Sequence, residues 1–116
     1  MTQVTIFHNP KCSKSRETLA LLESKKIMPR IVEYLKTPPS ASELDRILKL
    51  LDLEPRALMR KGEPEYRGLG LDDAKLTRAQ LIKAMVDNPR LIERPIVLAN
   101  GKAALGRPPA DVLKIL

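Results

Sequence analysis

The sequence predicts an α/β fold with one small mixed sheet and a helical region inserted between the two halves of that sheet. Two stretches with strand character flank a helical stretch near the start of the chain. Capped, amphipathic helices fill about residues 40–88, and a hairpin followed by a last helix ends the chain. The element order is therefore βαβ, helices, then ββα, in a single domain expected to span residues 1–116.

The first half of the sheet is predicted from a strand–helix–strand unit. Residues 3–8 alternate apolar and β-branched side chains, and Asn9-Pro10 ends this strand. A helix is expected over about 13–25, because its leucines repeat at helical spacing. A short strand over 31–34 completes the unit, and a right-handed crossover would make the two strands parallel.

Two capping motifs begin helices in the inserted region. In the SASE motif at 40–43, the first serine hydroxyl is expected to accept a hydrogen bond from the glutamate amide, while the glutamate side chain bonds back. The TRAQ motif at 77–80 predicts the same cap for a helix that ends at about residue 88. Between them we expect a short helix over 55–59 and a loop over 63–74.

The second half of the sheet is predicted from a hairpin. Residues 96–99 and 102–105 flank Asn100-Gly101, a turn whose two positions favour positive φ. Prolines then begin a terminal helix. A βαβ unit and a ββα unit in one mixed sheet form the thioredoxin-like arrangement. The pattern leaves open whether the bond before Pro95 is cis or trans.

Composition and charge exclude several functional classes. The 116 residues include 21 Lys and Arg against 14 Asp and Glu, giving a net charge of +7. The excess is spread evenly, with 10 basic and 7 acidic residues in 1–59 and 11 and 7 in 60–116. Since only three residues are aromatic, no base-stacking surface and no nucleic-acid partner are expected. The start of the chain lacks a signal-peptide pattern and no long apolar run is present, so we expect a cytoplasmic protein with no membrane partner.

Cys12 is the candidate nucleophile. It is the only cysteine, and it lies where a strand leads into a helix, a place where free amides and the helix dipole stabilise a thiolate. A single thiol excludes an internal disulfide, and Ser15 stands where a Cys-x-x-Cys pair would have its second cysteine. One cysteine and one histidine predict no metal site. An inert, buried cysteine is the alternative.

The lone histidine and three arginines are further candidates. His8 ends the first strand four residues before Cys12, so it could pair with the thiolate, although a surface or hydrogen-bonding role is also open. Arg60, Arg94 and Arg107 stand at boundaries between predicted elements. Guanidinium groups suit tetrahedral oxyanions, but each arginine could also be a solvated surface cation.

Five segments together resemble the ArsC-like family of glutathione- and glutaredoxin-dependent arsenate reductases. They run in register along the whole chain: Ile6–Arg16, Tyr34–Pro39, Leu58–Arg60, Arg94–Val97 and Gly106–Pro108. The chain also resembles the short bacterial branch of that family. The resemblance implies a thioredoxin-like fold with an inserted helical region, and a cis bond before Pro95.

The resemblance also implies a mechanism and the residues that perform it. These are Cys12 as the nucleophile, His8 and Ser15 as thiolate-stabilising residues, and Arg60, Arg94 and Arg107 as substrate-binding residues. The cysteine would attack arsenate and form a thiol ester. Glutathione, as co-substrate, would attack the adduct, and glutaredoxin would resolve the intermediate before arsenite leaves. No bound cofactor is implied.

Two alternative functions remain. One is a glutathione-linked thiol oxidoreductase or an oxyanion-binding protein with a different natural substrate. The other is a regulator of the same fold that binds RNA polymerase and senses oxidation through a Cys-x-x-Cys pair. Ser15 replaces the second cysteine of such a pair, which disfavours the regulator.

Overall fold

The computed structural model describes residues 3–116, so the first two residues of the predicted 1–116 domain lie outside the described residues. The chain forms two compact units. The sheet unit comprises Met1–Thr37 and Arg94–Leu116, and the helical unit comprises Pro38–Glu93. The helical unit contains the region of about 40–88 that the sequence predicts to be helical. That the whole chain is one domain remains a prediction.

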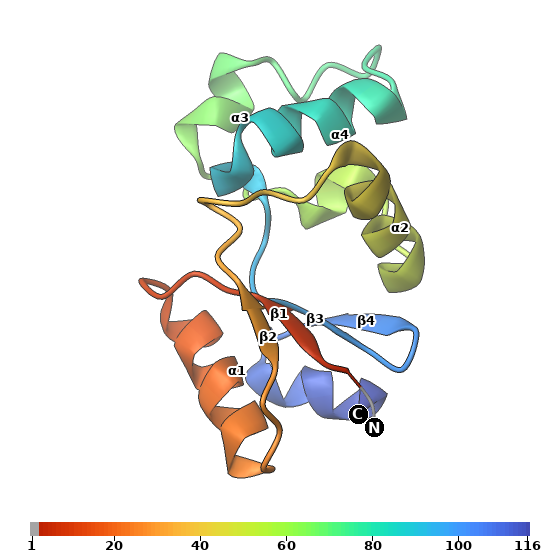
Figure 1. Ribbon diagram of the computed structural model, residues 1–116. Coiled ribbons are helices and arrows are strands. Elements are labelled where there is room, and N and C mark those ends of the chain that lie inside the picture. Colours follow the sequence, from red (N-terminus) through yellow and green to blue (C-terminus); the bar gives the residue numbers. More distant parts are fainter. Residues whose placement is uncertain (1–2) are drawn as a thin grey trace. The chain divides into compact units, whose positions relative to one another are not determined.

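The sheet unit has four strands in the order β2-β1-β3-β4 (Figure 1). The strands are β1 (Thr5–Phe7), β2 (Arg30–Val32), β3 (Ile96–Ala99) and β4 (Lys102–Leu105). β1 is parallel to β2 and antiparallel to β3, and β3 is antiparallel to β4. The predicted mixed sheet is confirmed, although its first two strands are shorter than the expected 3–8 and 31–34.

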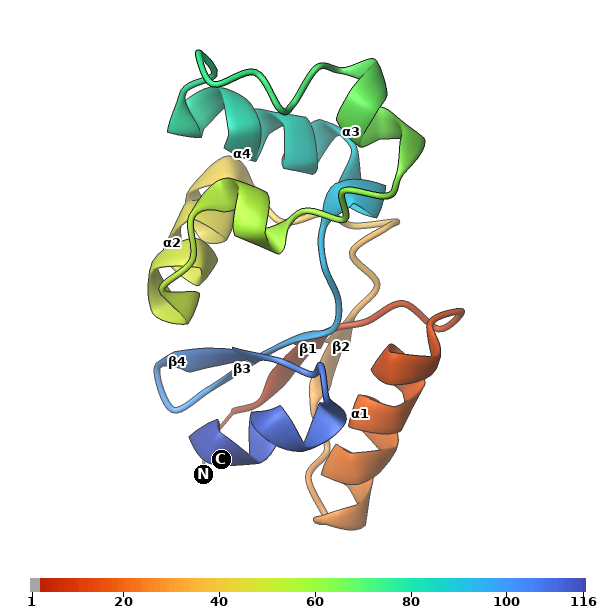
Figure 2. The ribbon, with the colours of Figure 1, turned by 180° about the vertical axis from the view of Figure 1, so that it is seen from behind.

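Two helices pack on one face of this sheet: α1 (Ser13–Ser24) and a terminal helix (Pro109–Ile115), drawn in blue in Figure 2. The core between the helices and the strands consists of Val4, Ile6, Leu22, Val97, Ala99, Val112 and Ile115. The terminal helix is a 3₁₀ helix. Its two buried residues are three positions apart, which matches the three residues per turn of that helix type.

The turn between β3 and β4 is the one that the sequence predicts. Asn100 and Gly101 have φ values of 55° and 71°, as their turn type requires. The Arg94-Pro95 bond is cis, the isomer that the family resemblance implies. The Arg107-Pro108 bond is also cis, and nothing in the sequence pattern predicts it.

The helical unit consists of α2 (Ala41–Leu51), a 3₁₀ turn (Pro55–Leu58), α3 (Pro64–Gly68), α4 (Arg78–Asp87) and a second 3₁₀ turn (Pro89–Leu91). α2 and α4 pack together through buried apolar residues. Thr77 and Gln80 form the complete capping box that begins α4. At α2 the structure shows the first of the two predicted bonds, from the Glu43 amide to Ser40 Oγ at 3.1 Å.

The prediction of a loop over residues 63–74 is wrong in its first half, because Pro64–Gly68 form helix α3. This helix begins with a proline, which suits the first helical position. None of its residues is buried, so it has no apolar stripe from which a helix could be predicted. Arg56 holds the rest of the loop, donating to the carbonyls of Leu71 (2.9 Å) and Asp73 (2.6 Å).

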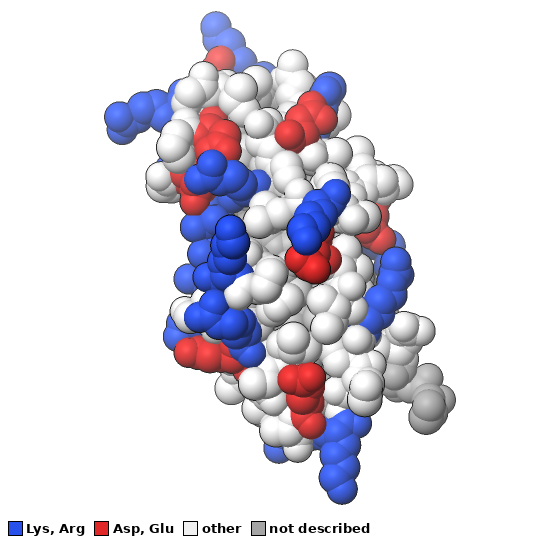
Figure 3. All heavy atoms as spheres, turned by 60° about the vertical axis from the view of Figure 1, so that its left-hand side comes forward, with Lys and Arg blue, Asp and Glu red and all other residues white. Residues whose placement is uncertain are grey.

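Two observations apply to residues 3–116. No helix there is both long and apolar enough to cross a membrane. Nor do three or more His, Cys, Asp or Glu side chains gather there in a group that could hold a metal ion. Figure 3 shows acidic side chains beside basic ones in several places on the face in view, and basic side chains gathered along its left side.

Candidate active site

Cys12 is the residue that caps the start of α1. Its backbone is extended, with φ −96° and ψ 125°, and its carbonyl accepts the bond from the Arg16 amide at 3.0 Å. Its own amide donates to the Asn9 carbonyl at 3.0 Å. The residue is buried, with 8% of its surface exposed. The thiol therefore lies at the first turn of a helix, where the amides have no helical acceptors.

The pKa of the Cys12 thiol is lowered from its ordinary value. Burial is the largest influence and raises the pKa, because a buried charge is poorly solvated. Hydrogen bonding from the Ser15 amide, the charge and hydrogen bond of the Arg94 guanidinium, and the Lys14 amide lower it. Together these donors outweigh burial, so Cys12 is biased toward the thiolate, which is the nucleophilic form.

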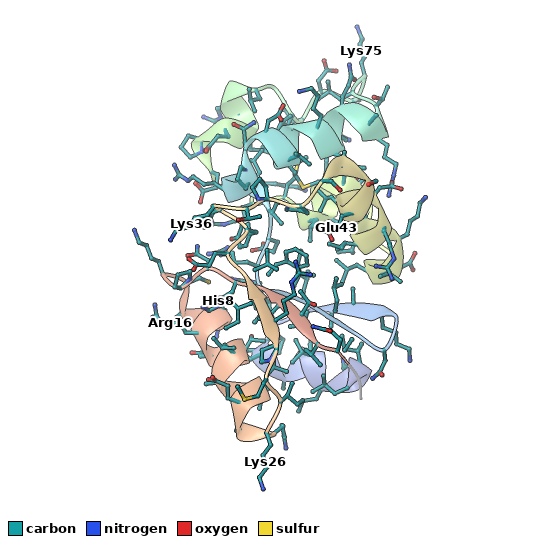
Figure 4. The ribbon with its side chains drawn as sticks, viewed as in Figure 1. His8, Arg16, Lys26, Lys36, Glu43 and Lys75 are labelled. Atoms are coloured by element: carbon teal, nitrogen blue, oxygen red, sulfur yellow. The ribbon has the colours of Figure 1, made fainter. Side chains whose placement is uncertain are left out.

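His8 and Ser15 bind each other beside this turn. Both are buried, and Ser15 Oγ lies 2.6 Å from His8 Nδ1. The same hydroxyl oxygen accepts a hydrogen bond from the Asn9 amide at 3.0 Å. Figure 4 shows His8 at the end of the sheet unit where β1 leads into α1, with Arg16 on the helix. The pair therefore ties the end of β1 to the first turn of α1.

Burial lowers the pKa of the His8 imidazole from its ordinary value of 6.5. Glu33 opposes this effect and Arg16 adds to it. His8 is therefore mainly neutral at neutral pH, and a neutral ring can accept the Ser15 hydroxyl proton at Nδ1. Its connection to the cysteine runs through Ser15. A thiolate-stabilising role for the two residues remains a prediction.

Two of the three predicted arginines lie in the sheet unit with Cys12. Arg94 acts on the thiol through its charge and a side-chain hydrogen bond. Arg107 Nη1 donates to the Arg94 carbonyl at 3.2 Å. A polarised thiol, the amides of a helix start and the Arg94 guanidinium thus come together from opposite ends of the chain, and Arg107 is bound to the backbone of Arg94. Such a set of donors suits a tetrahedral oxyanion.

Arg60 belongs to the helical unit. Its Nη2 lies 2.9 Å from Glu63 Oε1, and the other oxygen of Glu63 accepts from Arg90 Nη2 at 3.0 Å. The Arg60 amide also donates to the Leu91 carbonyl at 2.7 Å. These contacts fix both the backbone and the guanidinium of Arg60. An oxyanion-binding role for it remains a prediction.

One contact of the site follows from the predicted helix start, and another has no signal in the sequence. Ser15 acts on the thiol through its backbone amide, one of the free amides expected there, and every residue except proline would supply it. Arg107 binds the main chain of Arg94, and no spacing rule predicts a contact between a side chain and a distant carbonyl. The sequence identifies Arg107 by its type and context, but not this contact.

A mixed sheet with a cysteine of lowered thiol pKa at the start of the helix after β1 defines a thioredoxin-like protein. Residues 7–115 match the model of the ArsC family, and the chain belongs to this family. It is 55% identical to the uncharacterized protein YfgD of Escherichia coli K12 over 115 residues, which cover 98% of this chain and 97% of that protein.

Two further relatives are named for an activity. An arsenate reductase of Neisseria meningitidis serogroup A is 50% identical over 117 residues, the full length of both chains. The structure of an arsenate reductase from Vibrio cholerae superposes with a TM-score of 0.96 at 54% identity, covering 99% of this chain and 98% of the other. The family resemblance and the thioredoxin-like fold predicted from the sequence are thus confirmed.

Replacing Arg94 by alanine is expected to raise the pKa of the Cys12 thiol, because one of the groups that outweigh burial is removed. Less thiolate is then present near neutral pH, so iodoacetamide should alkylate Cys12 about tenfold more slowly, the effect of losing roughly one charge-assisted hydrogen bond. The measurement is the alkylation rate as a function of pH. Arg78→Ala, which breaks an ion pair with Asp45 in the helical unit, is the control. A native pH profile in Arg94→Ala would contradict the assignment.

The lowered pKa of His8 predicts that stability falls as the solution is acidified. The folded state holds the His8 proton more weakly than the unfolded state, whose imidazole titrates near 6.5. The stabilisation is therefore complete above 6.5 and is lost as the pH falls toward the pKa of the folded state. Urea unfolding of native protein and His8→Asn should show a steeper loss in the native protein between about pH 7 and 5.5, above the range where most carboxylates titrate. Equal slopes would show that His8 does not titrate in this way.

Proposed function

We propose that the protein reduces arsenate to arsenite, with glutathione and glutaredoxin as external reductants. The observation that carries the proposal is the Cys12 thiol of lowered pKa at the first turn of α1, next to the Arg94 guanidinium. The names of the relatives from Neisseria meningitidis and Vibrio cholerae support arsenate as the oxyanion.

The first step is attack of the Cys12 thiolate on arsenic. A sulfur–arsenic bond forms, one arsenic–oxygen bond breaks, and the departing oxygen takes up protons and leaves as water. Arsenic remains As(V) in this adduct. Arg94 and Arg107 neutralise its remaining oxygens, and Arg60 is the third ligand because its segment matches the family.

Reduction then needs two electrons, which one cysteine cannot supply by forming an internal disulfide. The glutathione thiol attacks arsenic in the adduct and displaces a second oxygen as water. A glutaredoxin thiolate then attacks the glutathione sulfur, so the glutathione–arsenic bond breaks, its electron pair reduces As(V) to As(III), and the two sulfurs leave as a mixed disulfide. Water finally replaces the Cys12 sulfur on arsenic, which releases arsenite and regenerates the Cys12 thiol. In total, arsenate and two thiols give arsenite, a disulfide and water. The reductants belong to a reducing compartment, so the proposal includes a cytoplasmic location.

His8 and Ser15 stabilise the thiolate through the shape of the turn. Ser15 Oγ is held by both the Asn9 amide and His8 Nδ1. With its side chain fixed in this way, the Ser15 amide is held toward the Cys12 sulfur, where it lowers the thiol pKa. The neutral ring of His8 suits this role, since it needs only to hydrogen-bond the hydroxyl.

Arsenate-dependent NADPH oxidation, with glutathione, glutaredoxin and glutathione reductase present, tests the proposal. Native protein should turn over, and Cys12→Ser should not, because the serine hydroxyl is not ionised near neutral pH. Leaving out either glutathione or glutaredoxin should also stop turnover. Native activity no greater than that of Cys12→Ser would contradict arsenate reduction.

The predicted oxyanion ligands are tested by Arg60→Ala and Arg107→Ala. Each should raise KM for arsenate about tenfold or more, the effect of losing one charge-assisted hydrogen bond to the substrate. Cys12 should still be alkylated in both variants. Arg78→Ala serves again as the control and should leave KM unchanged. Native KM values in both variants would show that these arginines do not bind arsenate.

A glutathione-linked thiol reductase with a different substrate is the second candidate. It is supported by the Cys12 thiol of lowered pKa, because such a thiolate attacks disulfides as well as oxyanions. That function would give Cys12-dependent reduction of a glutathione mixed disulfide with a higher kcat/KM than arsenate has. The assay above, run with both substrates, separates the two functions.

A further inference from the structure

Gly106 is buried in the sheet unit and has no space for a side chain. A Cβ atom there would lie 2.4 Å from Thr18 Oγ1, 2.7 Å from Pro95 Cγ and 3.1 Å from Thr18 Cγ2. The φ of Gly106 is outside the left-handed region, unlike that of Gly101. Glycine is therefore required at this position by close approach and not by backbone conformation.

Hydrogen bonds hold the same three residues together. The Gly106 amide donates to the Pro95 carbonyl at 2.9 Å. The Thr18 hydroxyl donates to the Lys14 carbonyl at 2.8 Å and lies 3.5 Å from the Gly106 carbonyl. Thr18 is fully buried. A short, buried side chain and a proline ring cannot swing aside as a long flexible side chain would, so a Cβ at this point would move backbone.

This Thr18–Pro95–Gly106 contact adjoins the groups that act on the cysteine. Its proline directly follows Arg94, whose guanidinium bonds the Cys12 thiol. Its glycine directly precedes Arg107, which donates to the Arg94 carbonyl. Its threonine is bonded to Lys14, in the first turn of α1. The contact thus joins the helix start to both segments that carry the arginines.

We propose that Gly106 is a positioning residue, whose missing side chain sets the distance of Arg94 and Arg107 from the Cys12 thiol. It touches neither the thiol nor a substrate and acts through the two arginines. A larger residue separates α1 from the two arginine segments, so the guanidinium groups no longer reach the sulfur and its adduct together. The inference rests on the proposed function in one respect, since these arginines are its oxyanion ligands.

Gly106→Ala tests the inference, with Gly68→Ala as a matched control. A Cβ at Gly68 meets nothing within 4 Å, so the same substitution there adds no contact. The pH profile of Cys12 alkylation should move to higher pH in Gly106→Ala, with a rate about tenfold lower near neutral pH. KM for arsenate should rise by a similar factor. Gly68→Ala should stay within about twofold of the native protein in both measurements.

A second variant separates positioning from loss of packing. Thr18→Ala in the Gly106→Ala background removes the atoms at 2.4 and 3.1 Å and leaves Pro95 Cγ, at 2.7 Å, as the one close atom. The space vacated by the threonine lets residue 106 move away from the proline ring, so this double variant should fold and should recover part of the native alkylation rate and KM, even if Gly106→Ala alone does not fold. A folded Gly106→Ala with the native profile and KM would overturn the inference. So would a double variant that regains native stability but keeps the altered profile.

The two readouts also distinguish this inference from the proposed function. Alkylation requires no arsenate, so slowed alkylation in Gly106→Ala together with no turnover by the native protein would contradict the proposed function alone. Turnover by the native protein together with native alkylation and KM in Gly106→Ala would contradict the inference alone.

Discussion

A buried thiol ionises only when nearby donors replace the water that it has lost. At Cys12 burial is the largest single influence on the thiol pKa, and it acts against the thiolate. The Ser15 and Lys14 amides and the Arg94 guanidinium together reverse that outcome. The reactivity of this protein therefore depends on the balance between one unfavourable and several favourable interactions, and each part of the sheet unit that holds a donor in place contributes to it.

Some of the donors that lower the thiol pKa require only secondary structure, and others require tertiary structure. The Ser15 amide is present as soon as α1 forms, because a helix start leaves its first amides without partners. The contribution of Arg94 depends on tertiary structure. Arg94 lies just before β3, so it approaches the start of α1 only when β3 pairs antiparallel with β1. An isolated α1 segment would thus have the amides but not the Arg94 guanidinium. The full lowering of the Cys12 thiol pKa therefore requires the folded sheet unit.

This division explains how much could be predicted from the sequence. The Asn100-Gly101 turn and the position of Cys12 rest on local signals, and the structure has both where they were expected. Helix α3 was missed because none of its residues is buried, which leaves no periodic pattern. The contact between Thr18 and Gly106 joins residues 88 positions apart, and it cannot be predicted from either residue type. Propensity and periodicity describe neighbours along the chain, whereas this contact is created by packing.

Burial of Cys12 also affects the second half of the proposed reaction. An incoming thiol could attack the adduct at sulfur or at arsenic. Only 8% of the cysteine is exposed, and the Ser15 and Lys14 amides and the Arg94 guanidinium bind its thiol. In the adduct of the proposed reaction, arsenic would be more accessible than this sulfur, and a guanidinium on its oxygens would make it more electrophilic. In the proposed reaction, the burial that opposes ionisation of the free thiol would therefore also direct the reductant to arsenic.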